Sequence, residues 1–218
     1  GRTSTVWTYL ASPMGLRALC IGIAKYEDSR YRLDYADSDA VVLARSFQQQ
    51  KGLFRDKGVE TKILLNEAAA FDSIIKEIDE LRERCTQHDL TVLTLSGHGL
   101  MSAQGEYYFM PYDYKPGRPL TATAISEEDF RKSLDDFPGA VLLVLDTCHS
   151  GKFVSAGTRG AMAESELKSA MRQFAKIRDG LVVFTACMPE ELARESADWR
   201  HGALSLAMIE GLTGRYLV

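Results

Sequence analysis

Val141-Leu-Leu-Val-Leu-Asp-Thr-Cys-His-Ser-Gly151 is the stretch that decides the fold of this chain. Its first five residues are all apolar, which indicates a strand of a parallel sheet that is buried on both faces. The apolar run stops at Asp146, and we expect the chain to turn at Ser150-Gly151. The pattern therefore places Cys148 at the carboxyl end of a buried strand, where open α/β sheets bind their ligands.

A second stretch, Leu90-Thr-Val-Leu-Thr-Leu-Ser96, also has the pattern of a buried strand and leads into Gly97-His98-Gly99. One strand thus delivers an imidazole and the other a thiol, both at their carboxyl ends. If the two strands are parallel neighbours, the two side chains can meet. A Cys–His pair brought together by the fold is the minimal catalytic dyad of a thiol hydrolase.

The rest of the chain alternates between strand and helix patterns, which predicts a doubly wound α/β sandwich. Residues 105–111 resemble part of a hairpin, and residues 152–163 form a long loop rich in Gly, Ser and Ala. Residues 1–16 have no clear period, so we interpret them as an N-terminal extension or linker before a domain at 17–218. Further strands are expected at 17–24, 60–65 and 181–186, and helices at 40–47, 72–84, 126–134, 164–177 and 202–211.

Composition excludes several classes of protein. The chain has 218 residues and a net charge of −4, with no block of basic residues, so a nucleic-acid partner is not expected. No apolar run reaches the roughly 20 residues of a membrane span, and the chain does not open with a signal peptide. The wide spacing of its cysteines fits neither a zinc site nor a disulfide framework, which favours reduced thiols in a cytoplasmic protein. These cysteines are Cys20, Cys85, Cys148 and Cys187.

The two strand-end motifs carry a resemblance to a known family. Ser96-Gly-His-Gly99 and Asp146-Thr-Cys-His-Ser-Gly151 resemble the motifs of caspase-type cysteine peptidases, on the metacaspase, orthocaspase and paracaspase side. Cys148 follows His98 by 50 positions, a separation already known for caspases. The resemblance runs from about Arg17 to the end of the chain. It implies a caspase-like three-layer α/β/α sandwich with a mostly parallel central sheet.

The same resemblance implies a role for each residue of the motifs. Cys148 would be the nucleophile of a cysteine endopeptidase, and His98 would be the general base and acid. The backbone N–H groups of Gly99 and Cys148 would stabilise the oxyanion. His149 is a poor candidate for the base, because neighbouring side chains on a strand diverge.

The resemblance also implies a preference for a basic residue at P1, the residue before the cleaved bond. Two acids of the P1 pocket in family members that cut after Arg or Lys correspond to Asp39 and Asp146. Two carboxylates can hold a guanidinium bidentately, so we expect Arg to be preferred over Lys and Asp to be rejected. Simpler roles remain open: Asp39 also suits a helix N-terminus, and Asp146 suits a strand end bonded to a nearby backbone N–H.

Activation and metal dependence follow from the resemblance less directly. Zymogens of the family are often cut in the loop after the thiol, so Arg159 is the candidate autoprocessing site, with Lys152 and Lys168 as alternatives. Some metacaspases require Ca²⁺, and the nearest acids here are Asp113 and residues 127–129. A downstream acid of the family's calcium site has no match in 152–163, and helix capping explains 127–129. We therefore assign no metal ligand and no required cofactor, and leave calcium dependence open.

Two competing interpretations remain. A clan relative of the separase, legumain or gingipain type would share the His-Gly and Cys motifs but have another P1 specificity. The second interpretation is a non-catalytic signalling or scaffold domain with the same fold. The presence of both His98 and Cys148 argues against it. The last strand expected for the family has no counterpart after Gly214. The chain would then be a fragment of a longer protein, or part of a complex that supplies the rest. A regulatory domain or an activating partner is a further expected partner.

Overall fold

The computed structural model describes residues 14–54, 57–149, 179–186, 195–196 and 200–214. The strands are β1 (Leu16–Gly22), β2 (Val59–Leu65), β3 (Leu90–Met101), β4 (Tyr107–Phe109), β5 (Ile125–Ser126), β6 (Ala140–His149), β7 (Leu181–Thr185), β8 (Glu195–Ser196) and β9 (His201–Gly202). The α-helices are α1 (Ala36–Gln48), α2 (Phe71–Arg84), α3 (Glu127–Asp135) and α5 (Ala203–Thr213). Short 3-10 helices span Ser29–Tyr31, Gln49–Gly52, Asn66–Ala69 and Leu120–Ala122.

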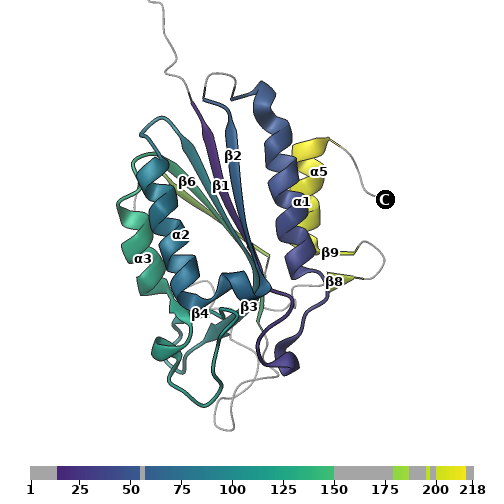
Figure 1. Ribbon diagram of the computed structural model, residues 1–218, viewed down its shortest axis with the longest axis vertical. Coiled ribbons are helices and arrows are strands. Elements are labelled where there is room, and N and C mark those ends of the chain that lie inside the picture. The colour runs from purple at the N-terminus through teal and green to yellow at the C-terminus, as the bar shows by residue number, and fades with distance from the viewer. Residues whose placement is uncertain (1–13, 55–56, 150–178, 187–194, 197–199, 215–218) are drawn as a thin grey trace, which may run out of the picture.

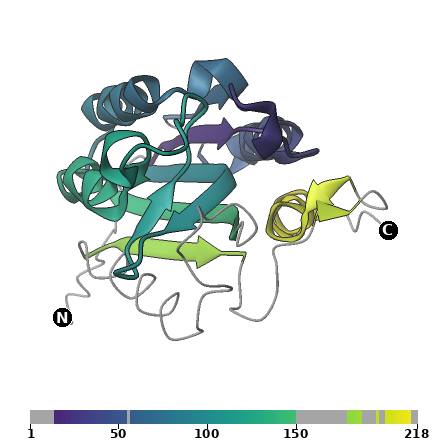
Figure 2. The same ribbon diagram turned by 90° about the horizontal axis from the view of Figure 1, so that it is seen from below.

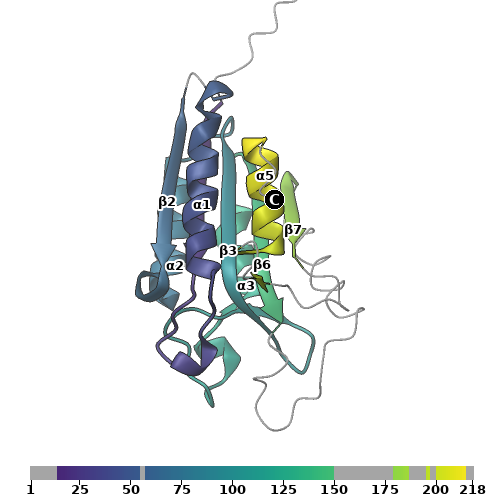
Figure 3. The same cartoon turned by 90° about the vertical axis from the view of Figure 1, so that its right-hand side faces the viewer.

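The helices lie on both faces of one central sheet (Figures 1 and 2). α2 and α3 cover one face, and α1 and α5 cover the other, where Figure 3 shows α5 alongside α1. The predicted three-layer α/β/α sandwich is therefore confirmed. No described helix combines the length and the apolar composition needed to cross a bilayer.

The core of the sheet is parallel, in the order β2-β1-β3-β6-β7. β3 occupies the centre, with β1 along one edge and β6 along the other. Strands covered on both faces have no solvent side, which explains why β1, β3 and β6 read as nearly continuous apolar runs. The sheet is mostly parallel, as predicted, and β4 and β5 add a short antiparallel extension.

Two strands extend further than the apolar pattern predicted. β3 continues to Met101, because β4 pairs antiparallel with it once β1 has ended. Gly97-His98-Gly99 therefore lies inside a strand and does not form the tip expected from the sequence. β6 likewise continues past Asp146 to His149, because β3 still pairs with it there. In both strands, hydrogen bonds to a neighbouring strand keep polar residues extended. The apolar pattern of one strand does not reveal which strand lies beside it, so these extensions were not predicted.

Side chains of the central strands alternate between two apolar cores. One core lies under α2 and α3 and joins Ile21, Leu93 and Leu143 to Ile78 and other helix residues. The other lies under α1 and α5 and contains Ala18, Cys20, Val92, Leu43 and Ile209. Cys20 is fully buried there.

The helices form where the periodicity placed them, within a few residues. The helix capping expected at 127–129 takes the form of a capping box: the Ser126 hydroxyl accepts from the Asp129 backbone N–H, and the Asp129 carboxylate accepts from the Ser126 N–H. The helix predicted at 164–177 and Cys187 lie outside the described residues.

The end of β1 approaches α1 so closely that only glycine fits there. A Cβ on Gly22 would lie 2.2 Å from the Ala36 carbonyl oxygen and 2.7 Å from the Ala40 Cβ. Gly22→Ala should therefore lower the free energy of unfolding by at least about 2 kcal/mol, since the clash is with backbone. Urea denaturation measures this. Gly52→Ala is the matched control, because a Cβ at Gly52 meets nothing within 4 Å; equal loss in both variants would contradict the prediction.

Candidate active site

The register between β3 and β6 places the two motifs side by side. His98 is the backbone partner of Cys148, and Gly97 and Gly99 are the partners of Thr147 and His149. Neighbouring strands of a sheet lie about 4.8 Å apart. The two strands are parallel neighbours, as the sequence analysis required, and the backbones of His98 and Cys148 lie directly opposite each other.

His98 is held in one orientation by a main-chain oxygen. Its imidazole is only 4% exposed, and Nε2 lies 2.9 Å from the Tyr31 carbonyl oxygen. A carbonyl oxygen can only accept a hydrogen bond, so this contact assigns the proton of the neutral imidazole to Nε2. Nδ1 is then the nitrogen that can accept a proton. Burial lowers the pKa of His98, although the hydrogen bond to Tyr31 opposes that shift.

Two tyrosines of the loop after β1 surround His98. The hydroxyl of Tyr26 accepts a hydrogen bond of 2.9 Å from the His98 backbone N–H. The ring of Tyr26 lies 5.2 Å from the imidazole at an interplanar angle of 31°, and the ring of Tyr31 contacts the imidazole edge-on at 6.2 Å. The sequence analysis gave this loop no role. The loop follows directly after a strand that ends at the same edge of the sheet as His98, and this position could have indicated that the loop contacts His98.

Asn66 ties the same loop to the rest of the molecule. Its Oδ1 accepts from the backbone N–H groups of Ala24 and Lys25, at 3.0 and 2.8 Å, and its Nδ2 donates to Asp37. Asn66 adopts a left-handed conformation with φ of 49°, which asparagine tolerates better than most residues. The sequence prediction placed Asn66 only as the residue directly after the strand at 60–65.

The glycines beside His98 make room for its neighbours. A Cβ on Gly97 would lie 2.8 Å from the Tyr26 hydroxyl oxygen. A Cβ on Gly99 would lie 3.0 Å from the ring of Tyr107 and 3.1 Å from Oγ1 of Thr147. Packing thus accounts for both glycines, and the oxyanion role of Gly99 stays a prediction.

The two acids assigned to the P1 pocket meet at the start of α5. Asp39 is 1% exposed; its Oδ2 accepts from the Gly202 N–H at 2.9 Å, and its Oδ1 lies 2.5 Å from Nδ1 of His201. Asp146 is 8% exposed, and its Oδ2 accepts from the N–H and the hydroxyl of Ser205 at 3.0 and 2.5 Å. Both carboxylates flank Gly202, where a Cβ would lie 2.6 Å from Asp146 Oδ2 and 3.2 Å from Asp39 Oδ2.

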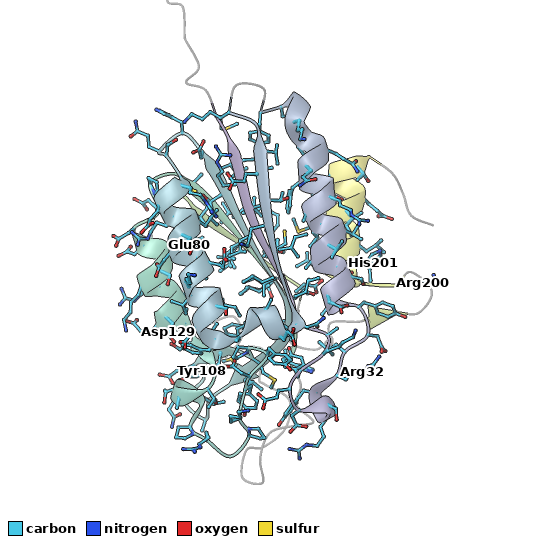
Figure 4. All side chains as sticks on the ribbon, viewed as in Figure 1. Arg32, Glu80, Tyr108, Asp129, Arg200 and His201 are labelled. Atoms are coloured by element: carbon cyan, nitrogen blue, oxygen red, sulfur yellow. The ribbon has the colours of Figure 1, made fainter. Side chains whose placement is uncertain are left out.

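The structural roles foreseen for these acids are also present. Asp39 lies in the first turn of α1, and Asp146 is bonded to a backbone N–H. Both carboxylates face the N-terminus of α5, where the helix dipole favours negative charge. His201, which Figure 4 shows on the α1 and α5 side of the molecule, had no role in the sequence prediction.

Burial governs the charge of this pair. It raises the pKa of Asp39 to about 6, against the hydrogen bonds from Gly202 and His201, and nearby Asp146 adds to the increase. Burial likewise raises the pKa of Asp146, opposed by the two hydrogen bonds from Ser205. Two buried carboxylates around one glycine form a site that a cation would stabilise.

The other predicted residues lie elsewhere. Asp113 accepts from the backbone N–H of Phe71 at the start of α2, and Asp129 belongs to the capping box of α3. Within the described ranges, no three His, Cys, Asp or Glu side chains gather as a metal site. Arg159, Lys152 and Lys168 fall outside the described residues.

The raised pKa of Asp39 predicts a pH-dependent contribution to stability. The carboxyl binds its proton more tightly in the folded state, so this contribution is present near pH 4 and is lost as pH rises through about 6. Asp39→Asn lacks it. The free energy of unfolding of the parent, minus that of the variant, should therefore fall by about 2 kcal/mol between pH 4 and pH 6.

Urea titrations at several pH values measure this difference, and Asp89→Asn is the contrast. Burial raises the pKa of Asp89, but hydrogen bonds from Thr86 and Gly15 outweigh it, so the net pKa is lowered. The contribution of Asp89 is lost only below its usual range, near pH 4. A flat difference curve for Asp39→Asn between pH 4 and 6 would contradict the prediction.

Comparisons with known proteins agree with this fold. A search of curated proteins found no match. Among solved structures, protein GSU0716 from Geobacter sulfurreducens is similar, with a TM-score of 0.63 and 20% sequence identity over 92% of this chain and 83% of that one. At that identity the likeness concerns the fold. The profile of the caspase domain matches residues 16–216, nearly the whole chain. The chain therefore belongs to the caspase-domain family of cysteine peptidases.

Proposed function

We propose that this chain is a cysteine endopeptidase that cleaves peptide bonds after Arg and, less well, after Lys. Cys148 is the nucleophile and His98 is the general base and acid. The observation that carries the proposal is the register in which His98 and Cys148 are partners on adjacent parallel strands. Laterally paired residues emerge on the same face of a sheet, which supports placing the thiol within reach of the imidazole.

The tautomer of His98 supports a definite proton path. Nε2 donates to the Tyr31 carbonyl, so Nδ1 takes the thiol proton as the Cys148 sulfur attacks the substrate carbonyl. The backbone N–H groups of Gly99 and Cys148 stabilise the oxyanion that forms. When the C–N bond breaks, Nδ1 returns the proton to the leaving amine, and water then hydrolyses the thioester. The lowered pKa of His98 keeps the imidazole neutral at the start of this cycle.

The P1 side chain binds between Asp39 and Asp146. Both carboxylates are buried and flank Gly202, and a Cβ there would lie 2.6 Å from Asp146 Oδ2 and 3.2 Å from Asp39 Oδ2. The described hydrogen bonds of Asp146 all go to Oδ2, so Oδ1 is the oxygen that we assign to the substrate. A planar guanidinium can bridge two carboxylates, which an ammonium does less well.

Processing and context complete the proposal. Residues 17–218 form the peptidase domain and residues 1–16 an extension or linker. Arg159 is the autoprocessing site of a zymogen, and a regulatory domain or activating partner controls it. The wide spacing of the cysteines supports a cytoplasmic location. No metal ligand is assigned: Asp113 accepts from the backbone at the start of α2, Asp129 belongs to the capping box of α3, and Glu128 pairs with Arg131.

Affinity labelling tests the nucleophile. A peptide electrophile with Arg at P1 should label Cys148, and peptide mass spectrometry identifies the site. His98→Gln should slow labelling at least about 100-fold, because the thiol loses its base. Cys85→Ala is the matched control and should label as the parent does, since burial raises the pKa of the Cys85 thiol.

The same experiment separates an enzyme from a scaffold. Cys20 is a built-in comparison, because burial raises its pKa to about 12 and leaves almost no thiolate. If Cys148 were labelled no faster than Cys20, the non-catalytic interpretation would be preferred. If Cys148 were labelled faster by an Asp-P1 electrophile than by an Arg-P1 one, a clan relative of other specificity would be preferred.

Paired substrates test the P1 pocket. Asp146→Asn should lower kcat/KM for an Arg-P1 peptide about 10- to 100-fold, the range expected for loss of a charged hydrogen-bond partner. A citrulline-P1 peptide, which has the same shape without the charge, should be affected far less. Ser205→Ala is the control, because it removes a hydrogen bond from Asp146 and keeps the carboxylate. Equal loss on both peptides would mean that Asp146 only anchors α5.

A further inference from the structure

We propose that Tyr26 is a positioning residue for His98, holding the imidazole by its face and its backbone by a hydrogen bond. This inference rests on the proposed function, in which Nδ1 of His98 moves the proton. It concerns a residue of the loop after β1, outside both strand-end motifs.

The contacts of Tyr26 reach His98 in two independent ways. Its hydroxyl oxygen accepts the backbone N–H of His98 at 2.9 Å, and its ring lies 5.2 Å from the imidazole, tilted by 31°. The hydrogen bond holds the main chain at His98, while the ring covers the imidazole. Together with the Tyr31 carbonyl at Nε2, these contacts restrain the position and the rotation of the imidazole.

The neighbouring residue is adapted to this arrangement. A Cβ on Gly97 would lie 2.8 Å from the Tyr26 hydroxyl oxygen, closer than real Cβ contacts allow. A glycine before His98 is thus needed for the Tyr26 hydroxyl to reach the backbone. Tyr26 can therefore contact His98 because β3 has no side chain at position 97.

Tyr26 is itself supported on both sides. Before it, Asn66 Oδ1 accepts the backbone N–H groups of Ala24 and Lys25. After it, the N–H of Glu27 donates to the Tyr112 carbonyl at 3.1 Å. Tyr26 is only 6% exposed. A residue that positions a reacting group to within a fraction of an ångström must itself be held in place, because otherwise it would move together with that group.

Two substitutions separate the two contacts. Tyr26→Phe removes the hydroxyl and keeps the ring, so kcat for an Arg-P1 peptide should fall about tenfold with KM unchanged, because a buried N–H loses its partner. Tyr26→Leu also removes the ring and should lower kcat further. Tyr108→Phe is the matched control: Tyr108 is equally buried, on β4, and its hydroxyl donates to Glu106 rather than to the site.

A second measurement does not depend on activity. The chain has four histidines, so the titration of His98 can be followed by NMR in a Cys148→Ala background. Burial lowers the pKa of His98, and removing the covering ring in Tyr26→Leu should move that pKa up towards its ordinary value. Tyr26→Phe and Tyr108→Phe should leave the titration near that of the parent.

The outcomes are distinct. If Tyr26→Phe and Tyr26→Leu keep the kcat of the parent, or lose no more than Tyr108→Phe while the His98 titration is unchanged, the proposal is wrong. If kcat falls at constant KM and the titration shifts only in Tyr26→Leu, it is supported. If no form of the protein cleaves peptides, the proposed function fails, and the titration still decides whether Tyr26 controls the environment of His98.

Discussion

The lateral pairing of β3 with β6 is the constraint on which the site depends. Parallel pairing repeats at every residue, so the match between Leu90 and Ala140 at one end already determines that His98 opposes Cys148 at the other. A slip of one residue would turn the side chains of one strand to the opposite face. The apolar residues of β3 and β6 are divided between two cores, one on each face, and such a slip would disrupt both. Core packing therefore sets the catalytic register.

The acids at the start of α5 hold that helix in place, and in the proposed function the same groups recognise the substrate. Asp39 and Asp146 bring carboxylates from α1 and β6 to the first N–H groups of α5, which holds that helix against the sheet. Two like charges buried together are unfavourable, and burial raises the pKa of both. The helix dipole and His201 offset part of this cost. A cationic P1 side chain would offset more of this cost, so the two carboxylates that would recognise the substrate also affect the stability of the fold.

The sequence predicted the layers, the parallel core and the two strands that carry His98 and Cys148, because apolar runs and helical periods are local signals. The exact strand ends were not predictable: His98 lies inside β3 because β6 pairs with it there and β4 pairs just beyond it, and the pairing with β6 joins residues far apart in the sequence. Tyr26, Asn66 and His201 were missed for the same reason. Each is a polar or aromatic residue outside the strands of the central sheet, and its role depends on which strand end it faces.

His98 is oriented by a carbonyl oxygen and not by a carboxylate, and this choice has a chemical consequence. A carboxylate at Nε2 would stabilise the imidazolium and raise its pKa, whereas the neutral oxygen of Tyr31 raises it less than burial lowers it. The imidazole therefore stays neutral and able to accept a proton. In the proposed mechanism, the cost is weaker electrostatic stabilisation of the imidazolium that forms when Nδ1 takes up the thiol proton. Firm positioning can compensate, because a base already aligned with its proton loses little entropy in reaching the transition state.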